Sequence, residues 1–140
     1  MVEDVIRTKI RALMRCLDRV RDKLPATPEA LAADPDLQDI VVVNLERAVQ
    51  QSVDIAAYLI ADKGLPAPSG MADSFTMLHE RGWISATTAA SLRASTGFRN
   101  IAVHEYEKLN WDIVHSIGSS RLDDFRKYIA ELQRSGVISL

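Results

Sequence analysis

Apolar residues recur every three or four positions along nearly the whole chain, and this spacing constrains the fold more than any other feature of the sequence. It puts the apolar side chains on one face of a helix, whereas a strand needs alternation at every second position. The longest periodic segment runs over residues 34–64. In it, Asp34 predicts the N-cap, Pro35 the first helical residue and Gly64 the end. Its predicted apolar face consists of Leu37, Ile40, Val41, Leu45, Ala48, Val49, Ile55, Ala56 and Leu59.

Segments on both sides of this long helix repeat at the same period and are bounded by residues that start or stop helices. The predicted caps are Thr27, Ser85 and Asn110, and the predicted ends are Pro25 and Gly82. In the helix after Ser85, the apolar positions are Ala89, Leu92 and Ile101. In the last helix, the expected core face is Ile113, Ile117, Phe125, Ile129 and Leu132, and Gly118-Ser119-Ser120 would bend it.

No segment predicts a strand, since the three consecutive valines at positions 41–43 lie inside the longest helical period. With 140 residues, the chain is long enough for one domain with a real core and too short for two comfortable ones. We therefore expect an all-α, antiparallel up-and-down bundle of four to five helices, forming a single domain over residues 1–140.

Composition bears on where the protein works and what it attracts. The formal charge of −2 gives no global attraction to nucleic acid, so any phosphate binding needs a local basic surface. The single cysteine, Cys16, lies among apolar residues, which predicts a packed thiol and a reducing compartment. The N-terminal residues do not form a signal peptide, and no apolar run approaches the ~20 residues of a membrane helix. These features predict a cytoplasmic protein that is not bound to a membrane.

A ridge of arginines lies beside the apolar face of the first helix. Arg7, Arg11, Arg15 and Arg19 are spaced four apart and so follow one line along the helix. The ridge is either a solvated face or a surface that steers RNA or a partner, and no aromatic residues are interleaved with it to favour nucleic acid.

A second polar cluster, in the sequence "TGFRNIAVHEY" at positions 96–106, is suited to chemistry. Asn100 and His104 are four apart and share a helix face, and Arg99 lies next to that face. A histidine exchanges protons near neutral pH, and an arginine binds phosphate and stabilises developing charge. This set suits metal-free cleavage of RNA, but the same residues could also cap or pair inside a dimer interface.

The three histidines form no paired motif that predicts a metal site, and no nucleotide-binding motif occurs, so we expect no metal or cofactor.

The pattern Arg99-Asn100-x-x-x-His104-x-Tyr106 resembles the R-N-x-x-x-H-x-Y motif of HEPN-fold proteins. More closely, almost the whole chain is similar to HepT, the toxin of HepT/MntA toxin–antitoxin pairs. This resemblance implies a helical bundle that forms a homodimer, with the motifs of both protomers facing one cleft.

The same resemblance implies roles for the motif residues. Arg99 and His104 would cleave RNA without metal, and Asn100 would position them. The partner of the family is MntA, a minimal nucleotidyltransferase that adds AMP to the motif tyrosine, here Tyr106. An adenylate beside the cleft would block RNA by its bulk and its negative charge.

Two other functions compete with the ribonuclease. One is a non-catalytic subunit that binds substrate or nucleotide for a small nucleotidyltransferase, and the other is a plain helical interaction domain. Replacement of Arg99 or His104 discriminates between them, because a catalytic pair can be removed without unfolding the chain or splitting a dimer.

Overall fold

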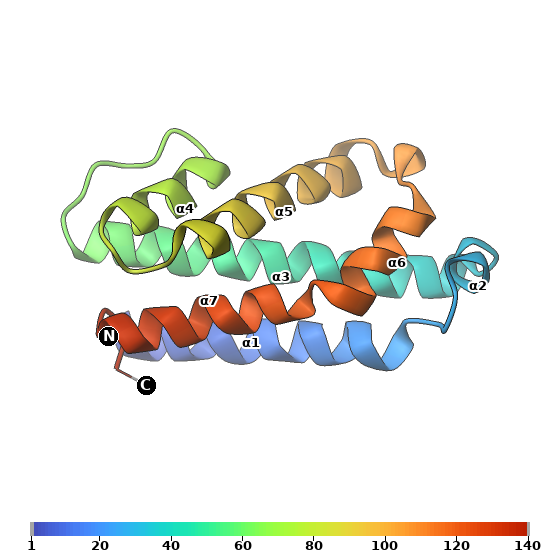
Figure 1. Cartoon of the computed structure of the whole chain (residues 1–140), viewed down its shortest axis with the longest axis horizontal. Coiled ribbons are helices and arrows are strands. Elements are labelled where there is room, and N and C mark those ends of the chain that lie inside the picture. Colours follow the sequence, from blue (N-terminus) through green and yellow to red (C-terminus); the bar gives the residue numbers. More distant parts are fainter. Residues whose placement is uncertain (1, 140) are drawn as a thin grey trace.

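Seven α-helices and one 3-10 helix account for most of residues 2–139, the part of the chain that the computed structural model describes, and no strand occurs among them (Figure 1). In chain order they are α1 (Val2–Lys23), α2 (Pro28–Ala32), α3 (Pro35–Asp62), α4 (Met71–Glu80), α5 (Ala86–His104), η1 (Tyr106–Lys108), α6 (Trp111–Ser120) and α7 (Leu122–Ser135). The prediction of an all-α bundle is confirmed. There are more helices than the four to five expected, because two are short and the last segment is divided.

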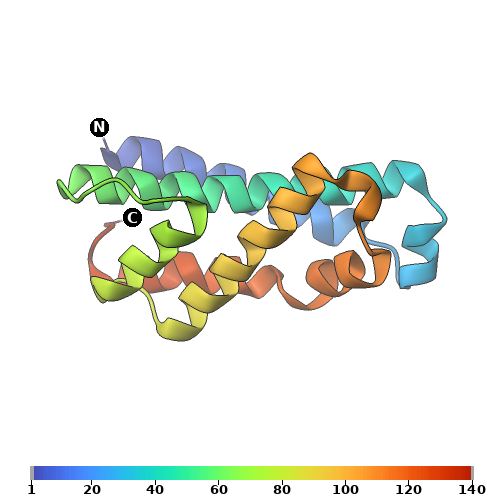
Figure 2. The same ribbon diagram turned by 90° about the horizontal axis from the view of Figure 1, so that it is seen from above.

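The long helix α3 is the centre of the bundle. Helices α1, α4 and α5 all pack on it, and α1 and α5 lie on opposite sides of it (Figure 1). Seen from above, α5 crosses α3 obliquely, and α6 and α7 run back along the other side of α5 (Figure 2). Successive long helices run in opposite directions, so the two chain termini lie at one end and the C-terminal end of α5 lies at the other.

Four helices, α2, α3, α5 and α6, begin at side chains that accept bonds from free backbone N–H groups. Oδ1 of Asp34 accepts from the N–H groups of Asp36 and Leu37 at 3.0 and 3.2 Å, and Thr27, Ser85 and Asn110 cap α2, α5 and α6 in the same way. Each cap satisfies N–H groups that have no partner within the helix. All four predicted caps are confirmed.

The core lies between α3 and the helices around it. Tyr128 of α7 is fully buried there, donates a hydrogen bond of 2.9 Å to the carbonyl of Ser52, and meets the ring of Phe75 edge-on at 5.7 Å between centroids. Cys16 is buried, as predicted, and burial raises the pKa of its thiol. Within the described part of the chain, no helix is both long and apolar enough to cross a lipid bilayer.

The last predicted helix is divided in two. α6 ends at Ser120 and α7 begins at Leu122, so the expected bend is a break at Arg121. The buried residues of α6 are Val114 and Gly118, which are four apart and define its inner face. A Cβ added to Gly118 would lie 3.1 Å from the methyl groups of Leu24, so the glycine lets α6 pack closely here.

This packing overturns one expected core residue. Ile113 is 58% exposed, although the sequence placed it on the core face. It is next to Val114 along the chain and therefore about 100° around the helix from the inner face. Ile117 is half-buried against the core, and Phe125, Ile129 and Leu132 are buried as expected.

Candidate functional site

The C-terminal end of α5 carries the predicted motif, but Tyr106 is not on that helix. The backbone of Glu105 leaves the helical region, with φ −142° and ψ 47°, so α5 ends at His104. Tyr106 is instead the first residue of η1. In this short helix, the N–H groups of Lys108 and Leu109 donate to the carbonyls of Glu105 and Tyr106. Tyr106 therefore lies outside the helix that carries the rest of the motif, because the chain turns back here towards the start of α3.

This turn gives the Tyr106 side chain two contacts. Its hydroxyl donates a hydrogen bond of 2.6 Å to Oδ1 of Asp39 on α3, and its ring meets Trp111 edge-on at 6.0 Å between centroids. Burial, the hydrogen bond to Asp39 and the charge of that carboxylate raise the pKa of Tyr106 well above its ordinary range. Sequence analysis missed Asp39, which is 67 positions away and has no motif around it.

Arg99 is half-buried on α5, and its Nε has lost contact with solvent without gaining a hydrogen-bond partner within residues 2–139. Such a buried donor costs about 1–3 kcal/mol, so most are paired in folded proteins. An acceptor from a ligand or another chain would satisfy this N–H.

Asn100 and His104 are both exposed, as expected for residues four apart on one helix face. Within the described residues, neither side chain has a hydrogen bond or an ion pair. Arg99 is five positions before His104, so helix geometry separates the two side chains by about 140°. One copy of the chain thus presents Arg99 and His104 in different directions, and does not bring them together.

Apolar residues surround this end of α5 on the outside. Ile101 and Val103 are 42% and 40% exposed, whereas Ala89 and Leu92, the other apolar positions named for this helix, are buried. Gly97, one turn earlier, is also exposed, and a Cβ added there would meet no atom within 4 Å. Exposed apolar side chains are typical of a surface that another molecule contacts. A glycine that packing within the chain does not require also lets another backbone approach closely.

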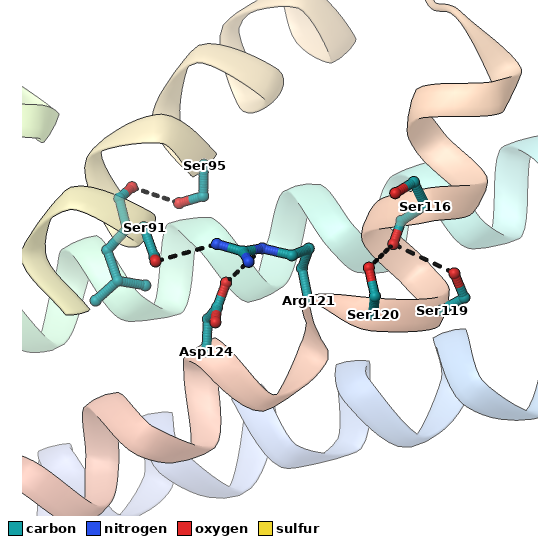
Figure 3. A network of polar contacts seen from close by, with 8 residues as sticks. Ser91, Ser95, Ser116, Ser119, Ser120, Arg121 and Asp124 are labelled. Atoms are coloured by element: carbon teal, nitrogen blue, oxygen red, sulfur yellow. Dashed lines mark hydrogen bonds and ion pairs between the residues drawn. The ribbon is translucent and has the colours of Figure 1, made fainter. Parts of the chain in front are cut away.

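A separate hollow lies between α5 and the α6–α7 break. It has a volume of about 120 Å³, its walls are mainly apolar, and Leu45, Leu92 and Phe125 are among them. At its rim, Arg121 bonds Ser91 at 3.2 Å and Asp124 at 2.9 Å (Figure 3). These polar groups satisfy one another, so the hollow presents no free group for chemistry, and the Arg121 contacts link α5 to α7.

The arginine ridge is separate from the motif. Arg7, Arg11, Arg15 and Arg19 are all exposed, but α1 lies on the side of α3 away from α5 (Figure 1).

The two histidines outside the motif, His79 and His115, bond the backbone carbonyls of Ile84 and Pro25, at 3.1 and 2.8 Å. The described residues hold no group of three or more His, Cys, Asp or Glu side chains that could bind a metal ion.

The fold and the motif together define a helical HEPN-type domain. A family model described as HepT-like, ribonuclease HepT-like, matches residues 13–132, so the chain belongs to the HepT-like ribonuclease family. The predictions of the family, the all-helical HEPN fold and an endoribonuclease are confirmed.

Individual relatives agree with this assignment. The chain is 34% identical over 128 residues to the mRNA nuclease HepT of Shewanella oneidensis, covering 91% of this chain and 96% of that protein. A structure of the tri-AMPylated Shewanella oneidensis HEPN toxin in complex with MNT antitoxin has a TM-score of 0.86 and 34% identity, covering 94% of this chain and 98% of that one. A toxin–antitoxin structure with AMP-PNP has a TM-score of 0.88 and 33% identity over the same shares of the two chains.

Proposed function

We propose that this chain is the toxin of a toxin–antitoxin pair, an endoribonuclease that cuts RNA without a metal ion through Arg99 and His104. The observation that carries the proposal is the buried Nε of Arg99 on α5, which has no hydrogen-bond partner within residues 2–139. A phosphate oxygen of RNA would supply the missing acceptor. The activity of the mRNA nuclease relative supports RNA as the substrate.

The two side chains divide the chemistry between them. His104 removes the proton of a ribose 2′-hydroxyl, whose oxygen then bonds to the adjacent phosphorus, and the bond from phosphorus to the leaving 5′ oxygen breaks as that oxygen is protonated. Arg99 binds the phosphate and stabilises the charge that develops on it in the transition state. Asn100 is proposed to position one or both groups, and its exposure leaves its amide free to do so.

The complete site is proposed to form between two copies of the chain. Arg99 and His104 of one copy point in different directions, so a symmetric partner is needed to bring an arginine and a histidine together. The exposed Ile101 lies one turn after Gly97 on the same face of α5, and this face offers an apolar and closely approachable surface for the homodimer.

The proposed antitoxin is a minimal nucleotidyltransferase of the MNT class, which adds AMP to Tyr106. Support comes from the AMPylated HEPN toxin bound to MNT antitoxin, to which this chain is similar along most of its length. Tyr106 follows His104 by two positions, so an adenylate on it would place bulk and negative charge beside the cleavage site. Such a pair works in the cytoplasm, where RNA and ATP are both present.

We propose that the arginine ridge on α1 binds RNA, at a place distant from the cleavage site. Arg7, Arg11, Arg15 and Arg19 are exposed, and α1 and the motif end lie on opposite sides of α3. The ridge would therefore contact parts of a long RNA that lie outside the scissile phosphate, and its effect would weaken as salt is raised.

The test is RNA cleavage by the purified chain in excess EDTA. We expect the wild type to cut, and both Arg99→Ala and His104→Ala to lose at least about 100-fold in rate while they stay folded. Arg134→Ala is the matched control, since it removes an exposed arginine from the other end of the bundle. If no RNA is cut by the wild type, a non-catalytic binding subunit replaces the ribonuclease as the better account.

A further inference from the structure

The hydroxyl of Tyr106 has one hydrogen-bond partner within residues 2–139, and that partner is the carboxylate of Asp39. The two residues come from different parts of the bundle, since Asp39 lies in the second turn of α3 and Tyr106 starts η1. Their 2.6 Å contact is short, as is usual when a hydroxyl donates to a charged oxygen. The rings of Tyr106 and Trp111 meet edge to face, with their centroids 6.0 Å apart, which helps to hold the tyrosine ring in place.

A tyrosine with these contacts remains a neutral phenol at physiological pH. Burial raises the pKa of Tyr106, and the bond to Asp39 and the charge of that carboxylate raise it further. The phenolate therefore does not form in advance. If Tyr106 is to attack an electrophile, its proton must leave during the attack, and it needs an acceptor within hydrogen-bond distance.

We propose that Asp39 is this acceptor: its carboxylate holds the Tyr106 hydroxyl in place and takes its proton as AMP is transferred to it. This inference rests on the proposed function, because it concerns the regulation of the same site. No resemblance or motif in the sequence assigned a role to Asp39.

The transfer balances with ATP as the second reactant. Oη of Tyr106 bonds to the α-phosphorus of ATP, and the bond from that phosphorus to the oxygen bridging to the β-phosphate breaks. Pyrophosphate leaves with the electron pair of that bond. The phenolic proton moves to Oδ1 of Asp39, which is the oxygen that already accepts the hydrogen bond.

Other groups near the hydroxyl are less suited to this step. His104 precedes Tyr106 by two positions, but it is exposed and has no hydrogen bond to the tyrosine. Glu105 forms an ion pair with Lys108 at 2.6 Å, so its carboxylate is already engaged on the exposed side of the turn. Asp36, one turn before Asp39 on α3, has no contact with Tyr106 among the described residues and lies in the first turn of the helix.

The experiment follows AMP transfer from ATP in the complex of this chain with its MNT-class nucleotidyltransferase, by intact mass under single-turnover conditions. Asp39→Asn is the decisive variant, because an amide oxygen still accepts the tyrosine hydrogen bond but does not take up a proton. We expect it to slow transfer about 100-fold, as much as Asp39→Ala does, whereas Asp39→Glu stays within about tenfold of the wild type.

Asp36→Asn is the matched control, since it removes the same charge from the same end of α3, and it should transfer AMP at the wild-type rate. Equal rates for Asp39→Asn and the wild type would overturn the role of Asp39 alone. A wild-type chain that takes up no AMP at Tyr106 would instead contradict the proposed function. Thermal unfolding of each variant separates a slow transfer from a poorly folded protein.

Discussion

Two tyrosines in this chain make the same pair of contacts in different regions and have different uses. Tyr128, in the core, donates to the carbonyl of Ser52 and meets Phe75 edge-on. Tyr106, at the motif end, donates to the carboxylate of Asp39 and meets Trp111 edge-on. Tyr128 is fully buried and its acceptor is a backbone carbonyl, so it can only stabilise the fold. Tyr106 is half-exposed and its acceptor can take a proton, so the same local arrangement becomes reactive.

This difference extends to the regions around the two residues. Around Tyr128, helices pack closely and polar groups are paired, for example Ser52, whose hydroxyl bonds the carbonyl of Ala48. Around the end of α5, a buried guanidinium N–H has no partner within residues 2–139, and apolar side chains face outward. The first region is complete in one chain, and we propose that a partner or substrate completes the second. Substitutions in the core should therefore change stability, and substitutions at the motif end should change activity or assembly.

The largest difference is expected between the two Tyr→Phe variants. Tyr106→Phe should abolish AMP incorporation completely, because no oxygen remains to attack, and should change stability little. Tyr128→Phe should accept AMP at the normal rate and lose about 1 kcal/mol of stability with its hydrogen bond. Intact mass after incubation with ATP and the antitoxin, together with denaturant unfolding, measures both effects. AMP on the Tyr106→Phe chain would show that the acceptor is another residue.

A smaller effect is expected from Gly118→Ala, in the packed region. Its new methyl group would lie 3.1 Å from the methyl groups of Leu24 and 3.3 Å from Cγ1 of Val20, so these side chains have to give way by a few tenths of an ångström. Overpacking of this kind costs about 1–3 kcal/mol. Denaturant unfolding should show this loss, while the rate of RNA cleavage per folded molecule stays as in the wild type. An equally stable variant would mean that α6 is not packed closely there.

Glu131→Gln tests how the core region holds the start of α5. The Glu131 carboxylate of α7 accepts bonds from the Ser85 N–H and the Thr88 hydroxyl. Burial alone would raise the pKa of Glu131, but these hydrogen bonds outweigh it and lower the pKa below the ordinary 4.5. The stability that the ionised group contributes is thus present above about pH 4.5 and lost as the pH falls further.

We therefore expect Glu131→Gln to be less stable than the wild type at neutral pH, by about 1 kcal/mol. The substitution removes a negative charge near the start of α5, and the hydrogen bonds from Ser85 and Thr88 become weaker because their acceptor is no longer charged. The difference should shrink as the pH falls below 4.5. The measurement is thermal unfolding of both proteins between about pH 3 and pH 7, because carboxylates titrate within this range. A constant difference across that range would contradict the linkage to ionisation.

The smallest effect, and one of opposite sign, is expected from Gly97→Ala at the motif end. A helical glycine is less favourable than alanine by about 0.5–1 kcal/mol, and here the added methyl group has free space in one chain. The variant should be more stable as a monomer but should dimerise or cleave RNA less well. Sedimentation at several concentrations and an unfolding curve measure the two parts. A more stable variant with unchanged assembly and cleavage would remove Gly97 from the proposed interface.

The sequence predicted the features that depend on local patterns. The caps at Asp34, Ser85 and Asn110 were recognisable because each lies just before an apolar helical period. The resemblance located Arg99 and His104 because the motif is continuous in the chain. Features that depend on packing were missed. The outward position of Ile113 follows from how α6 packs on α1 and α2, and the local period does not reveal that. The bend expected at Gly118-Ser119-Ser120 is present, but as a complete break at Arg121.

Asp39 was missed for the same reason. It is one of several acidic residues at the start of α3. It differs from the others because the turn after His104 brings Tyr106 into contact with it, and the sequence does not reveal this turn. Arg99 shows a different limit, since its spacing from His104 suggested one shared cluster. The structure separates the two side chains around α5, and the proposed site needs two copies to bring them together.

The most direct test of the central claim is complementation between two inactive variants. An Arg99→Ala chain and a His104→Ala chain carry different tags, are produced together, and the mixed dimer is purified and assayed for RNA cleavage in EDTA. If each site takes Arg99 from one copy and His104 from the other, one of the two sites in the mixed dimer is intact, and about half of the wild-type rate should return. A mixed dimer as inactive as either parent would contradict a shared site.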